Sequence, residues 1–185
     1  MKIYLTSDHH FFHKKIIGYC NRPFSSMEEM NEVMIEKWNK RVSDGDMVVH
    51  LGDFSLYKHE HTLNVVSQLN GDIILIKGNH DRRTRRFWIE EAGFKEYFKN
   101  DVAVSDNIIL SHRPRRMKDV INLHGHVHNN LDRYHSKNCV NLSVEVWDYY
   151  PVSLDEIELL SEEDKKIIKD FFDSFIKINF GHLEL

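Results

Sequence analysis

The sequence predicts an α/β fold, in which short buried strands alternate with helices along most of the chain. Five apolar runs rich in Ile and Val are the predicted strands, and they cover residues 2–7, 46–51, 72–77, 107–111 and 120–124. Each run ends in a short group of Asp, Asn or His residues. After the last run a further strand-like segment, at about 138–147, follows without an intervening helix, which indicates a second sheet.

Helical signals separate or follow these runs. Four helices are predicted, at about 26–42, 59–69, 84–92 and 161–179. Ser26 followed by Glu29 is a capping box at the start of the first helix, and its apolar residues recur at helical spacing. Gly71 and Gly93 follow the second and third helices as stop signals. We therefore expect one domain over residues 1–185 that ends in a helix.

Bulk composition excludes several classes of protein. The 185 residues are 41% hydrophobic and 29% charged, which is ordinary for a soluble globular chain. The net charge of −4 argues against a general nucleic-acid coat protein, so an anionic substrate would have to be attracted locally. No apolar run approaches the roughly 20 residues that span a bilayer. Cys20 and Cys139 form no disulfide framework, and the N-terminus turns polar too soon for a signal peptide, so a cytoplasmic location is expected.

The polar strand endings are the main functional signal. In order they are Asp8-His9-His10, Gly52-Asp53, Gly78-Asn79-His80-Asp81, His112 and Gly125-His126-Val127-His128. Because the carboxyl ends of parallel strands meet at one edge of a sheet, these side chains should share one cleft. Two carboxylates, several imidazoles and an amide suit a pair of divalent metal ions, and hydrolysis of a phosphate ester is the leading interpretation.

Two of the motifs place a pair of candidate ligands two residues apart. In extended geometry Asp8 and His10 project to the same side, and so do His126 and His128. An Asp-x-His pair is a weak signal by itself in a chain with 13 histidines. The prediction rests instead on five motifs that all fall at strand ends.

The remaining motifs supply single candidate ligands. Gly52 lets the chain leave its strand sharply, and the two oxygens of Asp53 can bridge two ions, although a turn or helix-cap role is the alternative. Asn79 offers a neutral hard oxygen, whereas the adjacent His80 points the other way and is assigned to the leaving oxygen of the substrate. A lone residue such as His112 is more often structural than a ligand.

Together these motifs, over about residues 1–130, resemble the calcineurin-like metallophosphoesterase superfamily, and most closely its small single-domain bacterial or phage members. The resemblance implies a two-sheet β-sandwich flanked by helices, with a dinuclear site at the sheet edge. One metal would be held by Asp8, His10, Asp53 and His128. The other would be held by Asp53, Asn79, His112 and His126, so that Asp53 bridges the pair. His80 resembles the proton-donating or transition-state-stabilising histidine of the superfamily.

One position departs from the pattern of many phosphatases in the superfamily. They carry a further Asp three residues after the bridging one, where it supports the catalytic His. Leu56 occupies that position here. The sequence leaves open whether Asp81 supports His80 instead.

The expected chemistry follows from the ligand set. Two ions about 3.5–4 Å apart neutralise the charge of the phosphate, and a water or hydroxide that they hold attacks in line. His80 would assist departure of the leaving group. Asp53, as the bridging ligand, is the other candidate catalytic residue. Carboxylate, amide and imidazole ligands suit Mn, Fe, Co, Ni or Zn, and the resemblance favours Mn.

Two groups of arginines directly follow site motifs and could form a basic rim. They are Arg82, Arg83, Arg85 and Arg86 after Asp81, and Arg113, Arg115 and Arg116 after His112. We take Arg82, Arg113, Arg115 and His13 as candidate substrate-binding residues, for further phosphates or a nucleic-acid backbone. The alternative is a solvated face whose guanidinium groups pair with Glu90, Glu91 or Asp119.

Hydrolysis of phosphodiesters or nucleotides is preferred, since no cap domain is visible. An oligonucleotide is a further candidate substrate, whereas no membrane partner is expected. One alternative is a mononuclear metal hydrolase of a non-phosphate bond, and another is a non-catalytic nucleic-acid-binding module. The choice between monoesters and diesters stays open, as does the oligomeric state, for which a dimer is one option.

Overall fold

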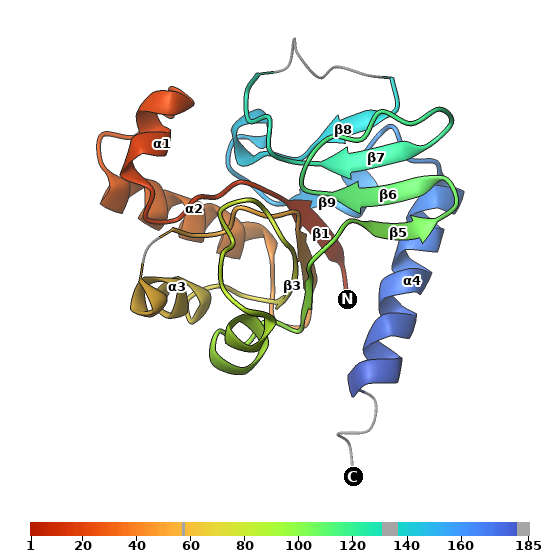
Figure 1. Ribbon diagram of the computed structural model, residues 1–185, viewed down its shortest axis with the longest axis horizontal. Coiled ribbons are helices and arrows are strands. Elements are labelled where there is room, and N and C mark those ends of the chain that lie inside the picture. The colour runs from red at the N-terminus through yellow and green to blue at the C-terminus, as the bar shows by residue number, and fades with distance from the viewer. Residues whose placement is uncertain (57, 131–136, 181–185) are drawn as a thin grey trace.

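Two β-sheets pack face to face, and helices cover the outside of the sandwich (Figure 1). The computed structural model describes residues 1–56, 58–130 and 137–180. The last five residues of the expected domain, 181–185, lie outside this description. No helix among the described residues is both long and apolar enough to cross a membrane.

The first sheet has five strands in the order β4-β3-β2-β1-β9. Four of them run parallel: β1 (Ile3–Thr6), β2 (Met47–His50), β3 (Asp72–Ile76) and β4 (Glu96–Phe98). The short edge strand β9 (Val152–Ser153) is antiparallel to β1. The central strands β1 and β2 are buried along their whole length, as expected for parallel strands that are covered on both faces.

The second sheet has the order β5-β6-β7-β8. Its strands are β5 (Val102–Ser105), β6 (Ile108–Ser111), β7 (Ile121–His124) and β8 (Cys139–Asn141). The last three are parallel to one another, and β5 is antiparallel to β6. Both sheets are therefore mixed, and each contributes parallel strands whose carboxyl ends lie at the same edge of the sandwich.

The helices lie on the two outer sides. Three of them follow strands of the first half: α1 (Lys14–Tyr19), α2 (Met27–Arg41) and α3 (His59–Val66). The terminal helix α4 (Glu162–Phe180) runs beside β5 on the opposite side (Figure 1). Short turns complete the fold: the π-helical η1 (Phe87–Glu91) and the 3₁₀ turns η2 (Val144–Trp147) and η3 (Leu154–Glu156).

Alternating side chains of the first sheet belong to two separate hydrophobic cores. Tyr4 and Val48 face the helical side, where they pack with Trp38 of α2. Leu5 and Val49 point to the other face and meet apolar residues of the second sheet and of α4. The period of two along each strand thus divides the interior into a helix–sheet layer and a sheet–sheet layer.

The predicted α/β sandwich of two sheets is confirmed, and all five predicted strands are present within one residue at each end. Four short strands or helices were not predicted from the sequence: α1, β4, β5 and β9. Each has at most six residues, too few for a periodic pattern to identify it. Ser26 caps α2 by accepting from the Glu29 amide at 3.0 Å, but the Glu29 carboxylate bonds Ser25 rather than closing the box.

Two segment predictions were confirmed only in part. The helix expected at 84–92 is largely the single π-helical turn η1, in which the Ala92 amide donates to the Phe87 carbonyl oxygen. Of the strand-like segment 138–147, only Cys139–Asn141 is a strand, and the chain then turns into η2. Its β-branched residues suggested an extended chain, but the Tyr149 amide donates to the Val144 carbonyl oxygen and curls this segment.

Trp38 anchors α2 to the first sheet, and its removal should be costly. Its side chain is fully buried, and its indole nitrogen donates to the Asn70 carbonyl oxygen at 2.9 Å. We predict that Trp38→Ala lowers the free energy of unfolding by about 3–5 kcal/mol, because it leaves a cavity. Trp38→Phe retains most of the apolar contact and should lose less. Urea unfolding followed by circular dichroism measures both, and equal midpoints for the alanine variant and wild type would contradict this role.

Candidate metal centre

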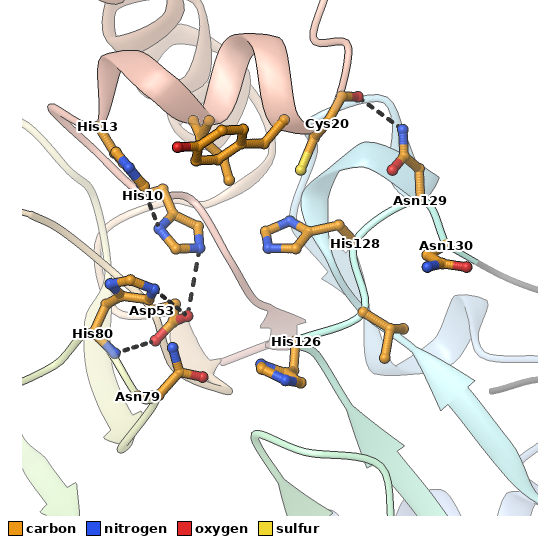
Figure 2. A pocket seen from close by; sticks show the side chains of 13 residues that line it. His10, His13, Cys20, Asp53, Asn79, His80, His126, His128, Asn129 and Asn130 are labelled. Atoms are coloured by element: carbon orange, nitrogen blue, oxygen red, sulfur yellow. Dashed lines mark hydrogen bonds and ion pairs between the residues drawn. The ribbon is translucent and has the colours of Figure 1, made fainter. Parts of the chain in front are cut away.

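The five polar strand endings meet at one edge of the sandwich, where the carboxyl ends of β1, β2 and β3 adjoin those of β6 and β7. Four of them border a cleft of about 450 Å³ (Figure 2), and the fifth, His112, lines a pocket that shares Asn79 with this cleft. Its lining includes His10, Asp53, Asn79, His80 and, from β7, the histidines of the last motif. The predicted convergence of the motifs is therefore present in the fold.

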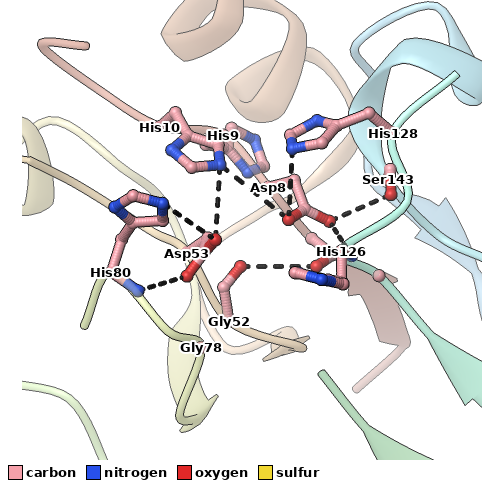
Figure 3. Close-up of polar contacts among 12 residues, drawn as sticks. Asp8, His9, His10, Gly52, Asp53, Gly78, His80, His126, His128 and Ser143 are labelled. Carbon is pink, nitrogen blue, oxygen red and sulfur yellow. Dashed lines mark hydrogen bonds and ion pairs between the residues drawn. The ribbon is translucent and has the colours of Figure 1, made fainter. Parts of the chain in front are cut away.

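One group of side chains gathers around Asp8. The His10 Nε2 atom lies 4.0 Å from Asp8 Oδ1, and His128 Nε2 lies 3.9 Å from the same oxygen (Figure 3). Ligand atoms of these three residues all lie within 4.8 Å of one another, which is close enough to surround a single cation. We call Asp8, His10 and His128 the first cluster.

A second cluster consists of Asp53, His112 and His126, whose ligand atoms also lie within 4.8 Å of one another. His112 Nε2 is 3.4 Å from Asp53 Oδ2 and 3.2 Å from His126 Nδ1. The Asn79 Oδ1 atom is 3.0 Å from His112 Nε2, so the amide oxygen belongs to the same group. Asp53 Oδ2 also lies 3.4 Å from His10 Nε2, which places this carboxylate between the two clusters.

Two atoms of the first cluster indicate that a cation fits there. Asp8 Oδ1 and His10 Nε2 are buried, and neither has a hydrogen-bond partner among the described residues. A buried polar atom without a partner costs on the order of 1–3 kcal/mol. Carboxylate oxygens and neutral imidazole nitrogens are donors for divalent transition metals, so a bound cation would satisfy both atoms.

The backbone of the candidate ligands is not extended, contrary to the expectation for the two i, i+2 pairs. The φ angles are 61° at Asp8, 52° at His10, 57° at Asp53, 72° at His126 and 51° at His128. These values lie in the left-handed region, which is unfavourable for residues other than Gly. The chain curls at each strand end, because amides such as that of His10 bond to the neighbouring loop, at the Asp53 carbonyl oxygen.

Asp81 braces two of these loops and does not support His80. Its carboxylate accepts hydrogen bonds from the amides of Asp53 at 2.7 Å, Gly78 at 2.8 Å and Phe54 at 3.0 Å. Burial and the Asp53 carboxylate raise the pKa of Asp81 to about 6. Gly78 is required here because a Cβ atom would overlap the Asp53 amide nitrogen and carboxylate.

His80 lies at the open side of the centre. Its amide donates to Asp53 Oδ1 at 2.7 Å, and its ring Nε2 lies 4.0 Å from Asp53 Oδ2. About a third of the side chain, 34%, is exposed in the cleft. Within the described chain no carboxylate holds its other ring nitrogen, and Leu56 lines a neighbouring pocket with it. The backbone amide thus positions this residue, and Asp53 is the acidic group beside its ring.

The sequence analysis missed a buried ion pair behind the first cluster. Glu145 accepts from His128 Nδ1 at 2.9 Å and from Arg22 Nη2 at 2.6 Å. Arg22 also donates to the carbonyl oxygens of Asp8 at 2.6 Å and His9 at 2.8 Å. Glu145 and Arg22 therefore orient both His128 and the Asp8 loop. They lie 123 residues apart, and no local pattern links them.

The electrostatics favour a proton on one imidazole of each cluster, His128 in the first and His112 in the second, whereas burial lowers the pKa of His10 and of His126. Burial opposes charge on His128, but hydrogen bonds to Cys20 and Glu145 and the charge of Asp8 raise its pKa. Burial likewise opposes charge on His112, whereas the Asp53 carboxylate raises its pKa. The Asp53 carboxyl, despite burial, is held below its usual pKa range by His112 and His10. Positive charge is therefore favourable at both clusters.

The candidate substrate residues have mixed positions. His13 lines the cleft, with Nδ1 3.3 Å from His10 Nδ1, and Arg82 lines the adjoining pocket beside His80. Arg113 Nη2 is 3.5 Å from Asn79 Oδ1. Much of the expected basic rim is paired instead: Arg85 with Glu96, Arg86 with Glu90, and Arg115 with Asp101.

Glu145 should control metal affinity through His128. We predict that Glu145→Gln weakens binding of one cation by about 10–100-fold. The neutral amide would no longer fix the orientation of the His128 ring as the carboxylate does. Calorimetric titration with Mn²⁺ should show one of two binding steps displaced and the other retained. Glu156→Gln is the matched control, because Glu156 makes an exposed pair with Arg41 away from the cleft. Equal weakening of both steps, or of neither, would contradict this role.

Comparisons with known proteins show which chains this one is similar to. "Uncharacterized protein MJ1445" of Methanocaldococcus jannaschii is 42% identical over 178 residues, 90% of this chain and 94% of that protein. The crystal structure of a protein of unknown function, AQ665 from Aquifex aeolicus, has a TM-score of 0.64 and 27% identity. It covers 85% of this chain and 97% of that one. Pseudomonas putida nuclease MPE gives a TM-score of 0.46 at 20% identity, over 68% of this chain and 61% of the nuclease.

A family model described as calcineurin-like phosphoesterase matches residues 1–182, nearly the whole chain. This match confirms the resemblance predicted from the strand-end motifs. The enzymes of this family hydrolyse phosphoesters with divalent metal ions, and the His and Asp clusters above are candidate sites for such ions. The chain belongs to the calcineurin-like phosphoesterase family and is a metal-dependent phosphoester hydrolase.

Proposed function

We propose that this enzyme hydrolyses phosphodiesters or nucleotides at a dinuclear centre in which Asp53 is shared by two cations. The observation that carries the proposal is the position of the Asp53 carboxylate. Its Oδ2 atom lies 3.4 Å from both His10 Nε2 and His112 Nε2, one in each cluster. A carboxylate in that position is suited to bridge two ions.

Seven residues would hold the two cations. They are Asp8, His10 and His128 on one side, Asn79, His112 and His126 on the other, and Asp53 between them. Bound there, two divalent cations would neutralise phosphate charge and lower the pKa of a water molecule enough for it to attack phosphorus. None of the seven offers a thiolate, and this donor set suits Mn, our preferred metal, as well as Fe, Co, Ni or Zn.

His80 is the proposed group that assists the leaving oxygen. It is held close to Asp53 by its own amide, while its ring is accessible from the cleft. A ring in that position can donate a hydrogen bond, or a proton, to the oxygen that leaves phosphorus. His13 lies near His80 on the same side of the cleft, with ring centroids 5.8 Å apart, and is placed to contact the same part of the substrate (Figure 2).

The cleft also supports a substrate larger than inorganic phosphate. Its volume of about 450 Å³ falls within the range of small-molecule sites. Ile16 and Tyr19 supply an apolar wall, and the Tyr19 side chain is largely exposed, at 72%. Such a wall can accommodate a base or another flat organic group, which favours diesters and nucleotides over small monoesters.

Removal of the His80 ring should slow turnover without removing metal. We predict that His80→Ala keeps both cations and loses about 10²–10⁴-fold in kcat on an alkyl phosphodiester, whose leaving group needs a proton. The loss should be much smaller with bis(p-nitrophenyl) phosphate, since nitrophenolate leaves unassisted. Steady-state kinetics on the two esters, with metal content measured in parallel, test this. An equal loss on both esters would argue against the acid role.

Metal stoichiometry and diester hydrolysis test the proposal as a whole. Wild type should bind two Mn²⁺ per chain and hydrolyse bis(p-nitrophenyl) phosphate. Asp53→Asn should lose metal and activity together, because the amide has only one oxygen able to coordinate a cation. One metal per chain with no diester hydrolysis would instead favour the mononuclear alternative. Exposed Asp44→Asn is the matched control and should bind metal normally.

A further inference from the structure

Two lysines lie side by side at the edge of the first sheet, next to the metal centre. Lys77 follows β3 and Lys99 follows β4, one residue beyond the parallel pair Ile76 and Phe98. The Lys77 amide donates to the Phe98 carbonyl oxygen at 2.8 Å, which extends the pairing to this point. Like charges on neighbouring strand positions are unfavourable unless something compensates them.

These lysines belong to a pocket that adjoins the second cluster. The pocket has a volume of about 390 Å³, and Asn79 and His112 form the wall that it shares with the metal centre. Arg113 lines it too, within 3.5 Å of Asn79 Oδ1. The cationic side chains of this pocket therefore lie next to Asn79 and His112, two of the residues proposed to hold a cation.

Little negative charge balances this pocket from within the described part of the chain. Its one acidic lining residue, Asp101, accepts from Arg115 Nε at 2.7 Å. No ion pair joins Lys77, Lys99 or Arg113 to a described carboxylate. On a chain whose net charge is −4, this local excess of positive charge should attract an anion.

We propose that this pocket binds a second phosphate group of the substrate, held by Lys77 and Lys99 beside the phosphate that is cleaved. Lysine ammonium groups bind phosphate oxygens through charge-assisted hydrogen bonds, and Arg113 would link the two phosphate positions. The inference rests on the proposed function for the position of the scissile phosphate. The proposed substrates are therefore phosphate esters that carry a second phosphate group close to the one that is cleaved.

The pocket also predicts which part of the substrate carries that phosphate. His80 lines the cleft and a pocket beside it, whereas it does not line the lysine pocket. The leaving group would therefore lie on the side of His80, and the retained part would extend towards Lys77 and Lys99. A second phosphate on the retained part should improve the substrate.

Two esters with the same leaving group provide the test. Thymidine 5′-(p-nitrophenyl phosphate) releases nitrophenol and retains the nucleoside, and its 3′-phosphorylated form adds one phosphate to the retained part. In the manganese-loaded full chain, the extra phosphate should raise kcat/KM about tenfold, the size expected for two exposed ion pairs. In the double variant Lys77→Ala/Lys99→Ala that preference should fall to about one.

The matched control is Lys40→Ala/Lys166→Ala, which removes the same charge from exposed positions outside the pockets and should keep the tenfold preference. A preference that is unchanged in Lys77→Ala/Lys99→Ala, or absent from wild type, would overturn the proposal. The second phosphate could be an internal phosphodiester of a nucleic acid or a terminal phosphate. A third ester, with a methyl group on the 3′-phosphate, distinguishes the two. A retained preference indicates an internal phosphate of a nucleic acid, and a lost one indicates a terminal phosphate.

A binding measurement separates this inference from the proposed function. Thymidine 3′,5′-bisphosphate and thymidine 5′-monophosphate are the two nucleotide products, and their affinities can be measured without turnover. The bisphosphate should bind wild type about tenfold more tightly than the monophosphate does, and the double variant should bind the two equally. This result would support the phosphate pocket even if neither ester were hydrolysed. Equal affinities in wild type would exclude it.

Discussion

The Asp53 carboxylate is the interaction on which the rest of the site depends. One oxygen accepts from the His80 amide, and the other faces His10 and His112. This residue connects the loop after β2 to the loops after β1, β3 and β6, and so joins the two sheets at their common edge. The nearby imidazoles keep it ionised in spite of burial, since they hold its pKa below the usual range. A neutral side chain there would leave both clusters without their shared anion.

The loops that carry the candidate ligands are held in an unfavourable conformation by groups that take no direct part in the chemistry. Left-handed φ angles recur at Asp8, Asp53 and His126, and each such residue needs support from its surroundings. Asp81 supplies part of that support through three backbone amides, and Arg22 supplies part through the Asp8 and His9 carbonyl oxygens. These buried hydrogen bonds therefore hold the candidate ligands close together, although several of them have an unfavourable backbone conformation.

The two sides of the centre differ in chemistry. On one side the cleft combines His80 and His13 with an apolar wall at Ile16 and Tyr19. On the other side Lys77 and Lys99 line a cationic pocket that shares Asn79 and His112 with the second cluster. An organic leaving group suits the first side, and an anionic retained group suits the second. The asymmetry gives a substrate a preferred direction across the proposed metal pair.

The sequence by itself determined the strands and the polar residues at their ends, because Ile- and Val-rich runs and their termination are local patterns. It also indicated the family, through the order of the motifs. Only the tertiary structure decided the left-handed curl of Asp8 and His128, the bracing role of Asp81, and the contact between Arg22 and Glu145. These features depend on hydrogen bonds between segments far apart in the chain. The adjacent positions of Lys77 and Lys99 likewise follow from the register of β3 and β4, which no short stretch of sequence encodes.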